Sequence, residues 1–127
     1  MQKTIISTEK APKAIGPYSQ AVKVGNFIYT SGQLPMNPAT GELVKDDIKK
    51  AAEQCLENAK AILEEAGANL NQVIKSLVFV KDMGDFAAVN EVYAKYFTEN
   101  CPARSCVQAA KLPLDALVEM EFIAVVE

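Results

Sequence analysis

The chain has 127 residues, of which half are apolar and 23% are charged, and its net charge is -3. This composition is typical of one globular domain, residues 1–127, with a core of its own, and it is not that of a disordered chain. The negative charge and the scattered lysines argue against a nucleic-acid-binding surface, which needs clustered Lys and Arg.

The residue types that are present also limit the cofactors and the compartment. The chain has no histidine and three cysteines, Cys55, Cys101 and Cys106, whose spacing matches no zinc-site pattern. It also has no glycine-rich nucleotide-binding motif, so we expect neither a metal nor a cofactor. No segment has the apolar stretch of a signal peptide or a membrane span. We therefore expect a cytoplasmic protein with reduced thiols and no membrane partner.

The first third of the chain predicts short strands and turns. A β-branched run at 4–8 precedes an extended segment at 11–20 that contains two prolines and a glycine. Residues 21–32 predict a hairpin in which a two-residue turn, Gly25-Asn26, joins two strands. A loop rich in proline follows at 34–43.

Residues 46–67 predict an amphipathic helix. Apolar side chains recur there at the helical period, at positions 48, 52, 55, 59, 62, 63 and 66. Asp46 or Asp47 can cap the first turn, and Gly67 can end the last one. Cys55 lies on the apolar face, so we interpret it as a core residue and not as a reactive one.

The second half predicts three strands and a second helix. Residues 73–80 are mostly apolar, which indicates a strand buried on both faces. A helix capped by Asp85 is expected at 86–97. Strands at 103–110 and 116–126 flank a turn. Because short turns join antiparallel neighbours, we expect these last two strands to pair with each other.

This order of elements predicts an α+β fold: a single two-layer domain with a mixed β-sheet and two helices on one face. The last strand carries bulky apolar residues on both of its faces toward its end. Two-sided burial in a two-layer protein indicates that another subunit covers the second face. We therefore expect a homo-oligomer.

Arg104 is the most informative candidate site residue. It shares a strand face with Cys106, and Glu119 shares one with Glu121, because residues two apart in a strand point the same way. Arg104 could form a buried ion pair with one of these glutamates. Alternatively it forms an anion site, since a guanidinium binds a carboxylate in bidentate fashion and a free N–H near Cys106 would add a donor.

Other candidates also have a structural and a functional interpretation. Glu119 either pairs with a base or, partly desolvated, holds a water and accepts its proton. A nucleophilic Cys106 is disfavoured because no histidine can deprotonate it. Tyr18 either bonds locally on its loop or presents its phenol to a pocket. Ser31 and Gly32 either form an ordinary turn or allow the backbone to approach a ligand closely.

Several segments, at 14–22, 29–42, 78–97, 102–113 and 118–125, together resemble the Rid family of reactive-intermediate (enamine/imine) deaminases. The resemblance runs nearly from end to end, with ordered motifs at matching spacing. It implies a chorismate-mutase-like fold and a homotrimer with sites between subunits. It also implies hydrolysis of 2-imino acids such as 2-iminopropanoate and 2-iminobutanoate to 2-keto acids and ammonia, without a cofactor.

The resemblance also implies roles for individual residues. Arg104 is the carboxylate-binding residue, the backbone N–H of Cys106 assists it, and Glu119 rather than Glu121 handles water. The other matched pocket residues are Tyr18, Ser31, Gly32 and Asn90. Segment 98–105 is shorter than in many members, and its Cys101 can alter the pocket rim or expose a thiol.

Two other functions stay open at this point. A trimer that binds a small carboxylate without catalysis, and so regulates a partner, would have the same arginine pocket. Tolerance of Glu119→Gln would distinguish such a binder from a deaminase. An RNA-directed activity, proposed for some relatives, is disfavoured by the net charge of -3 and by the lack of a basic stripe.

Overall fold

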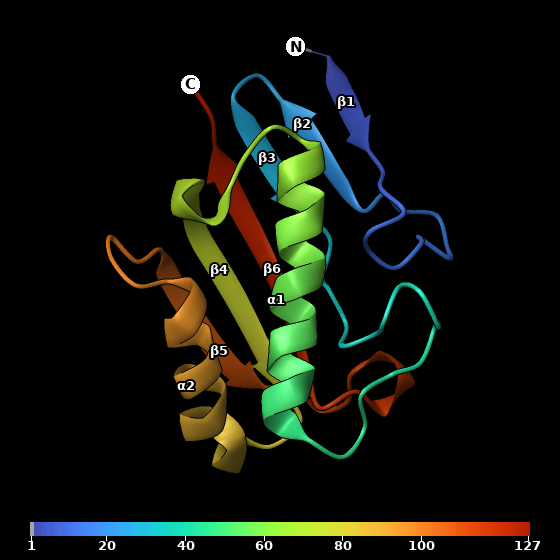
Figure 1. The fold of residues 1–127 in the computed structure, drawn as a ribbon, viewed down its shortest axis with the longest axis vertical. Helices are drawn as coiled ribbons and strands as arrows, with labels where there is room; N and C mark the ends of the chain where they lie inside the picture. The colour runs from blue at the N-terminus through green and yellow to red at the C-terminus, as the bar shows by residue number, and fades with distance from the viewer. Residues whose placement is uncertain (1) are drawn as a thin grey trace.

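The computed structural model describes residues 2–127 and has one mixed sheet with two helices packed on one of its faces (Figure 1). The strands follow one another across the sheet in the order β1-β2-β3-β6-β4-β5. The elements are β1 Lys3–Ile6, β2 Ala21–Val24, β3 Phe27–Thr30, α1 Ile48–Glu65, β4 Val73–Val80, α2 Phe86–Tyr96, β5 Ala103–Gln108 and β6 Val118–Val125. The predicted two-layer α+β fold is confirmed. Within the described part of the chain, neither helix has the length and apolar character needed to cross a membrane.

Local signals define the ends of α1 and the first hairpin. The Asp47 side chain accepts a hydrogen bond from the backbone N–H of Lys50 at 3.0 Å, as a helix N-cap does. Gly67 adopts a φ of +86° just after the helix, a conformation that glycine reaches without a Cβ clash. Gly25, at φ 58°, occupies the two-residue turn between β2 and β3. These three predictions are confirmed.

The core lies between the helices and the sheet. Alternate residues of β6 are buried on the helix side, among them Met120 and Phe122, and they meet the apolar face of α1. Cys55 is fully buried in this layer, with its Sγ 3.7 Å from the carbonyl oxygen of Val118. Burial raises the pKa of this thiol well above its usual value, which agrees with its interpretation as a core residue.

The expected pairing of the last two strands is wrong. β4 lies between them, parallel to β5 and antiparallel to β6 (Figure 1). The chain leaves β4, passes through α2 and returns as β5, and a helical crossover of this kind joins parallel strands. Residues 109–117 then carry the chain past the end of β4 to its other side. The short turn therefore spans an intervening strand instead of closing a hairpin.

Two smaller expectations also need correction. Asp85 occupies the N-cap position of α2, but its side chain makes no capping hydrogen bond. Asp82 instead accepts from the N–H of Gly84 in the short turn before the helix. β4 is not buried on both faces within the chain, because Leu77 and Phe79 on the far face are only half-buried. Burial of that face therefore needs something outside the chain.

The sheet face opposite the helices has no covering layer among residues 2–127. Its side chains are identified by strand register, since paired residues point to the same face. Phe27 and Tyr29 are each 43% exposed on it. The other apolar members are Ile5, Val22, Val24, Leu77, Phe79, Ala103, Val107, Ile123 and Val125. We call this set of residues the open face.

Candidate functional site

Four of the predicted site residues line one cavity of 610 Å³ at the edge of the open face. They are Tyr18, Ser31, Gly32 and Glu119. Glu121 lines it as well, and most of the remaining wall is apolar, formed by Pro12, Ile15, Leu34, Met36, Pro113 and Leu114. Lys13, Gln20 and Gln33 complete the lining. The cavity therefore combines two carboxylates, one lysine and an apolar wall, an arrangement that can bind a small organic molecule.

Gly32 allows the Glu119 carboxylate to lie against the backbone. A Cβ at position 32 would lie 2.8 Å from Cδ of Glu119 and would overlap its Oε2. The segment is held beside β6 because Gln33 and Met120 exchange two backbone hydrogen bonds, of 2.7 and 3.1 Å. Glycine thus leaves room for the carboxylate in this position, and a side chain at position 32 would displace it.

The surroundings of Glu119 suit a proton acceptor. Burial raises the pKa of its carboxyl above the usual value, and the negative charge of Glu121 raises it further. A carboxylate with a raised pKa takes a proton from a reacting water more readily than an exposed one does. Glu119 can therefore act as a general base at neutral pH.

Ser31 and Tyr18 belong to two segments that hydrogen bonds hold together. The Ser31 hydroxyl donates to the carbonyl of Ser19 at 2.5 Å, and its N–H donates to the carbonyl of Gln20 at 2.8 Å. Tyr18 is 51% exposed, and its hydroxyl accepts from the N–H of Ile15 at 3.4 Å. The Ser31 proton is thus already engaged, whereas the phenol of Tyr18 retains its own proton to donate.

Arg104, Asn90 and Cys106 form a second group elsewhere in the chain. The Nη1 of Arg104 donates to Oδ1 of Asn90 at 2.7 Å. Its guanidinium carbon lies 4.8 Å from the ring centre of Tyr93 and 5.5 Å from that of Phe86. All three of these neighbours project from α2, where positions 86, 90 and 93 fall on one face.

The ion-pair interpretation of Arg104 is wrong. Only two salt bridges form among residues 2–127, Lys49–Glu91 and Lys81–Asp115, and neither includes Arg104. Strand register also separates Arg104 from the glutamates. Arg104 pairs with Ser76 on the helix side of β4, whereas Glu119 pairs with Phe79 on the open face. Within the described chain, the guanidinium charge therefore has no carboxylate partner.

Cys106 presents a backbone donor at the edge of the sheet. The N–H of Ala109 bonds to the carbonyl of Val80, so the alternate N–H groups of β5 point toward β4. That alternation directs the N–H of Cys106 outward, and β5 is the last strand on that side. Burial raises the pKa of the Cys106 thiol, although the charge of Arg104 lowers it in part. A neutral thiol is a poor nucleophile, so the backbone is its more useful group.

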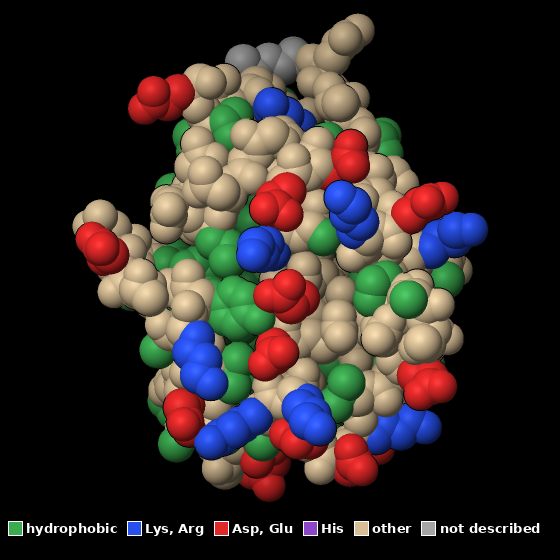
Figure 2. All heavy atoms as spheres, in the orientation of Figure 1, with side chains coloured by type: hydrophobic (Ala, Val, Ile, Leu, Met, Phe, Trp, Pro, Cys, Tyr) green, Lys and Arg blue, Asp and Glu red, His purple; other side chains and the backbone are tan. Residues whose placement is uncertain are grey.

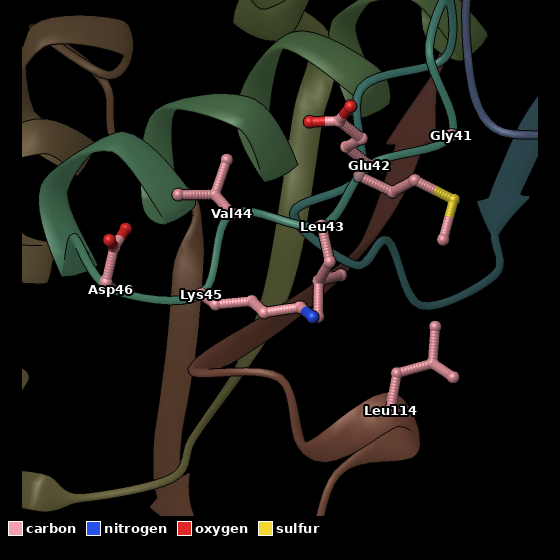
Figure 3. Close-up of a pocket in the computed structure, with 8 residues that line it drawn as sticks. Gly41, Glu42, Leu43, Val44, Lys45, Asp46 and Leu114 are labelled. Atoms are coloured by element: carbon pink, nitrogen blue, oxygen red, sulfur yellow. The ribbon is translucent and has the colours of Figure 1, made fainter.

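A larger cavity, of 770 Å³, lies in the loop between β3 and α1 (Figure 3). Residues 41–46 line it from one side, and Leu114 approaches from the turn before β6 (Figure 3). It contains none of the predicted site residues. Its walls lack a group of three His, Cys, Asp or Glu side chains placed to hold a metal, as does the rest of residues 2–127.

Sequence reasoning did not anticipate which residues support Arg104. Phe86 and Tyr93 lie within the helix predicted at 86–97, but nothing in the sequence assigned them to the surroundings of Arg104. Their spacing around Asn90, at i-4 and i+3, is a usable signal, because it places two aromatic rings beside one amide. The apolar wall residues Ile15 and Leu114 come from loops, and no local pattern identified them.

Comparison with known proteins shows the family. The model of the family described as Endoribonuclease L-PSP matches residues 8–126. This chain belongs to that family. A RutC family protein of Pyrococcus abyssi is 60% identical over 124 residues, which cover 98% of each chain. The 2-iminobutanoate/2-iminopropanoate deaminase of Escherichia coli K12 is 55% identical over 128 residues, again 98% of each chain. The resemblance to the Rid deaminases noted from the sequence is thereby confirmed.

Solved structures agree with this assignment. The crystal structure of E. coli TdcF with bound serine matches with a TM-score of 0.94 and 48% identity. The match covers 98% of this chain and 99% of that one. Because the two folds correspond nearly from end to end, the arrangement of helices and strands is that of the family.

Proposed function

We propose that this protein hydrolyses small 2-imino acids, such as 2-iminopropanoate and 2-iminobutanoate, to 2-keto acids and ammonia. The observation that carries the proposal is the guanidinium of Arg104, which is held by Asn90 and has no carboxylate partner within residues 2–127. Its free edge is suited to a substrate carboxylate. The name of the E. coli relative at 55% identity supports the same reaction.

The arginine group would bind the substrate carboxylate. A guanidinium offers two parallel N–H donors at the spacing of the two carboxylate oxygens, and the outward N–H of Cys106 adds a third. A bound serine in E. coli TdcF supports a ligand of this size and charge. An imino acid held at its carboxylate presents C2 at a fixed distance from the anchor.

We propose that two subunits complete each site. Arg104 and Glu119 lie on opposite faces of the sheet, with β4 between their strands, so one chain does not bring them together. The open face exposes a set of apolar side chains that includes Phe27 and Tyr29, and exposed apolar patches mark interaction surfaces. A neighbour packed there would place its arginine group beside the cavity that contains Glu119. The homotrimer implied by the Rid resemblance meets this requirement.

The chemistry needs only the groups already described. A protonated imine is electrophilic at C2, so water adds there as Glu119 accepts one of its protons. The new C–O bond gives a tetrahedral carbinolamine. Glu119 then returns this proton to the nitrogen and accepts the hydroxyl proton as the C–N bond breaks, which releases ammonia and leaves the C=O bond of the keto acid. Acid–base help of this kind typically contributes about 10²- to 10⁴-fold.

A coupled assay tests the proposal. A serine/threonine dehydratase generates the enamine in the cuvette, and keto-acid formation is followed with and without this protein. The assay is run at mildly alkaline pH, where we expect a smaller fraction of the free imine to be protonated and spontaneous hydrolysis to be slow. Wild-type protein should accelerate product formation. Arg104→Lys should remain folded but lose most of this acceleration, because an ammonium cannot offer the two parallel N–H donors of a guanidinium. Lys111→Ala, which removes a positive charge from an exposed position, is the matched control.

Two other results would redirect the assignment. A folded protein with no acceleration, which still binds 2-oxobutanoate through Arg104, would be a carboxylate-binding module. Salt-dependent RNA binding would favour the endoribonuclease activity that the family description names. On the helix-bearing side acidic and basic side chains are interspersed, so that side offers no continuous basic surface for RNA (Figure 2).

A further inference from the structure

The guanidinium of Arg104 rests on the ring of Tyr93. Its central carbon lies 4.8 Å from the ring centre, within the range of a cation–π contact. Asn90 holds one edge through Nη1 at 2.7 Å. The ring of Phe86 also lies over the group, with its centre 5.5 Å from the same carbon, so two rings and one hydrogen bond together restrict the plane of the guanidinium.

The Tyr93 ring is itself fixed from behind. Its hydroxyl and that of Ser76 are hydrogen-bonded at 2.7 Å, and both residues are buried. The ring also packs on Phe97, with ring centres 4.5 Å apart. Phe97 in turn lies 6.1 Å from the ring of Phe122 in the core. Tyr93 therefore has little freedom to tilt or to slide.

Ser76 connects this support to the strand that carries Arg104. Ser76 in β4 is the register partner of Arg104 in β5. The two residues are thus linked twice, once through neighbouring backbones and once through the Tyr93 side chain. A buried hydroxyl pair adds little net stability over apolar groups of the same shape, so stability alone gives a weak reason for it.

We propose that Tyr93, fixed by its hydrogen bond to Ser76, is a positioning residue that orients the Arg104 guanidinium so that its free edge receives the substrate carboxylate. The inference rests on the carboxylate-binding role given to Arg104 under the proposed function. Burial raises the pKa of Tyr93, so the ring remains a neutral phenol beneath the cation at neutral pH. Substrate binding then depends on two hydroxyl groups that never touch the substrate.

The decisive variants separate positioning from stability. Tyr93→Phe and Ser76→Ala each leave one buried hydroxyl without its partner, so each should lower stability. The double variant removes both hydroxyls and should recover most of that loss. If the hydroxyl pair positions Arg104, KM stays raised in the double variant by about 3- to 10-fold with kcat nearly unchanged. Ser76→Thr keeps the hydroxyl and should retain the wild-type KM. A wild-type KM in the stable double variant would overturn the proposal.

A second readout does not depend on turnover. Arg104 is the only arginine in the chain, so an α-dicarbonyl reagent such as phenylglyoxal reports on one guanidinium. Removing the ring in Tyr93→Leu should expose one face of that group and speed modification by about threefold or more. Protection by 2-oxobutanoate should weaken in the same variant.

The two readouts distinguish the possible failures. If the wild-type protein has no deaminase activity, the proposed reaction fails, but the modification rates still test the positioning role. Unchanged modification and unchanged protection in Tyr93→Leu would overturn that role. Faster modification with weaker protection would support it even in a protein that only binds carboxylates.

Discussion

The substitution Gly32→Ala tests how closely the site is packed around Glu119. The new Cβ would lie 2.8 Å from Cδ of Glu119, so this carboxyl carbon must retreat by roughly 0.7 Å to reach the usual contact distance of about 3.5 Å. The carboxylate is the mobile end of a side chain beside an open cavity. It can therefore move aside at a rotamer cost of about 1 kcal/mol.

Activity should suffer far more than stability. A displacement of this order at a reacting group can lower the rate by about 10²-fold, because the base no longer reaches the attacking water. We expect kcat/KM in the coupled assay to fall by about that factor. The free energy of unfolding in urea should fall by only about 1 kcal/mol.

Repeating Gly32→Ala in a Glu119→Ala variant tests whether the Glu119 carboxylate is the group that the new Cβ meets. In Glu119→Ala the obstructing carboxylate is absent, and Gly32 has no positive φ that an alanine would strain. Gly32→Ala should then be neutral or stabilising by about 0.4–1 kcal/mol, through the reduced entropy of the unfolded chain. An equal loss of stability in both backgrounds, or wild-type kcat/KM in the single variant, would refute the reasoning.

Further predictions concern the base, the open face and the first helix. Burial and Glu121 raise the pKa of Glu119, so activity should decline on the acid side at a higher pH than it would with an ordinary glutamate. Glu121→Gln should shift this decline to lower pH. An unshifted pH profile would exclude Glu119 as the titrating base. The raised pKa means that the folded state holds this proton more tightly than the unfolded chain does. The stability that Glu119 contributes is thus complete below the usual carboxyl pKa and is lost as pH rises through the raised pKa. Glu119→Gln should therefore flatten the pH dependence of the free energy of unfolding, measured in urea from acid to neutral pH. Phe79→Glu places a charge on the open face and should convert the proposed three-chain assembly into free chains of 13.8 kDa in sedimentation velocity. An assembly that is unchanged by this substitution would place the interface elsewhere. Asp47→Ala removes the α1 cap and should cost about 1 kcal/mol in urea unfolding without changing KM, and Asp46→Ala serves as its control.

The sequence was most informative where neighbouring residues decide the structure. The start and end of α1 follow from Asp47 and Gly67, whose effects act within one helical turn. The first hairpin likewise depends on the two residues of its turn. The family motifs also led from the sequence to a list of candidate site residues, because each motif is a short continuous segment.

Strand pairing was a different matter. The turn before β6 gave no local sign that β4 would lie between β5 and β6. That order depends on α2, which returns the chain parallel to β4, and on the packing of both helices over one sheet face (Figure 1). The expected proximity of Arg104 to the glutamates is wrong for the same reason, because β4 separates the strand of Arg104, β5, from the strand of the glutamates, β6.

The sequence by itself therefore determined the elements, their order, the single arginine and the residue types available for chemistry. Only the tertiary structure decided that Arg104 lies on one face of the sheet and Glu119 on the other. It also decided that the arginine rests on Tyr93, and that Glu119 lies against Gly32. The physical reason is that capping, turns and periodicity act over a few residues. The positions of charges relative to one another depend on which strands become neighbours, and that is settled by burying the apolar faces of the whole chain together.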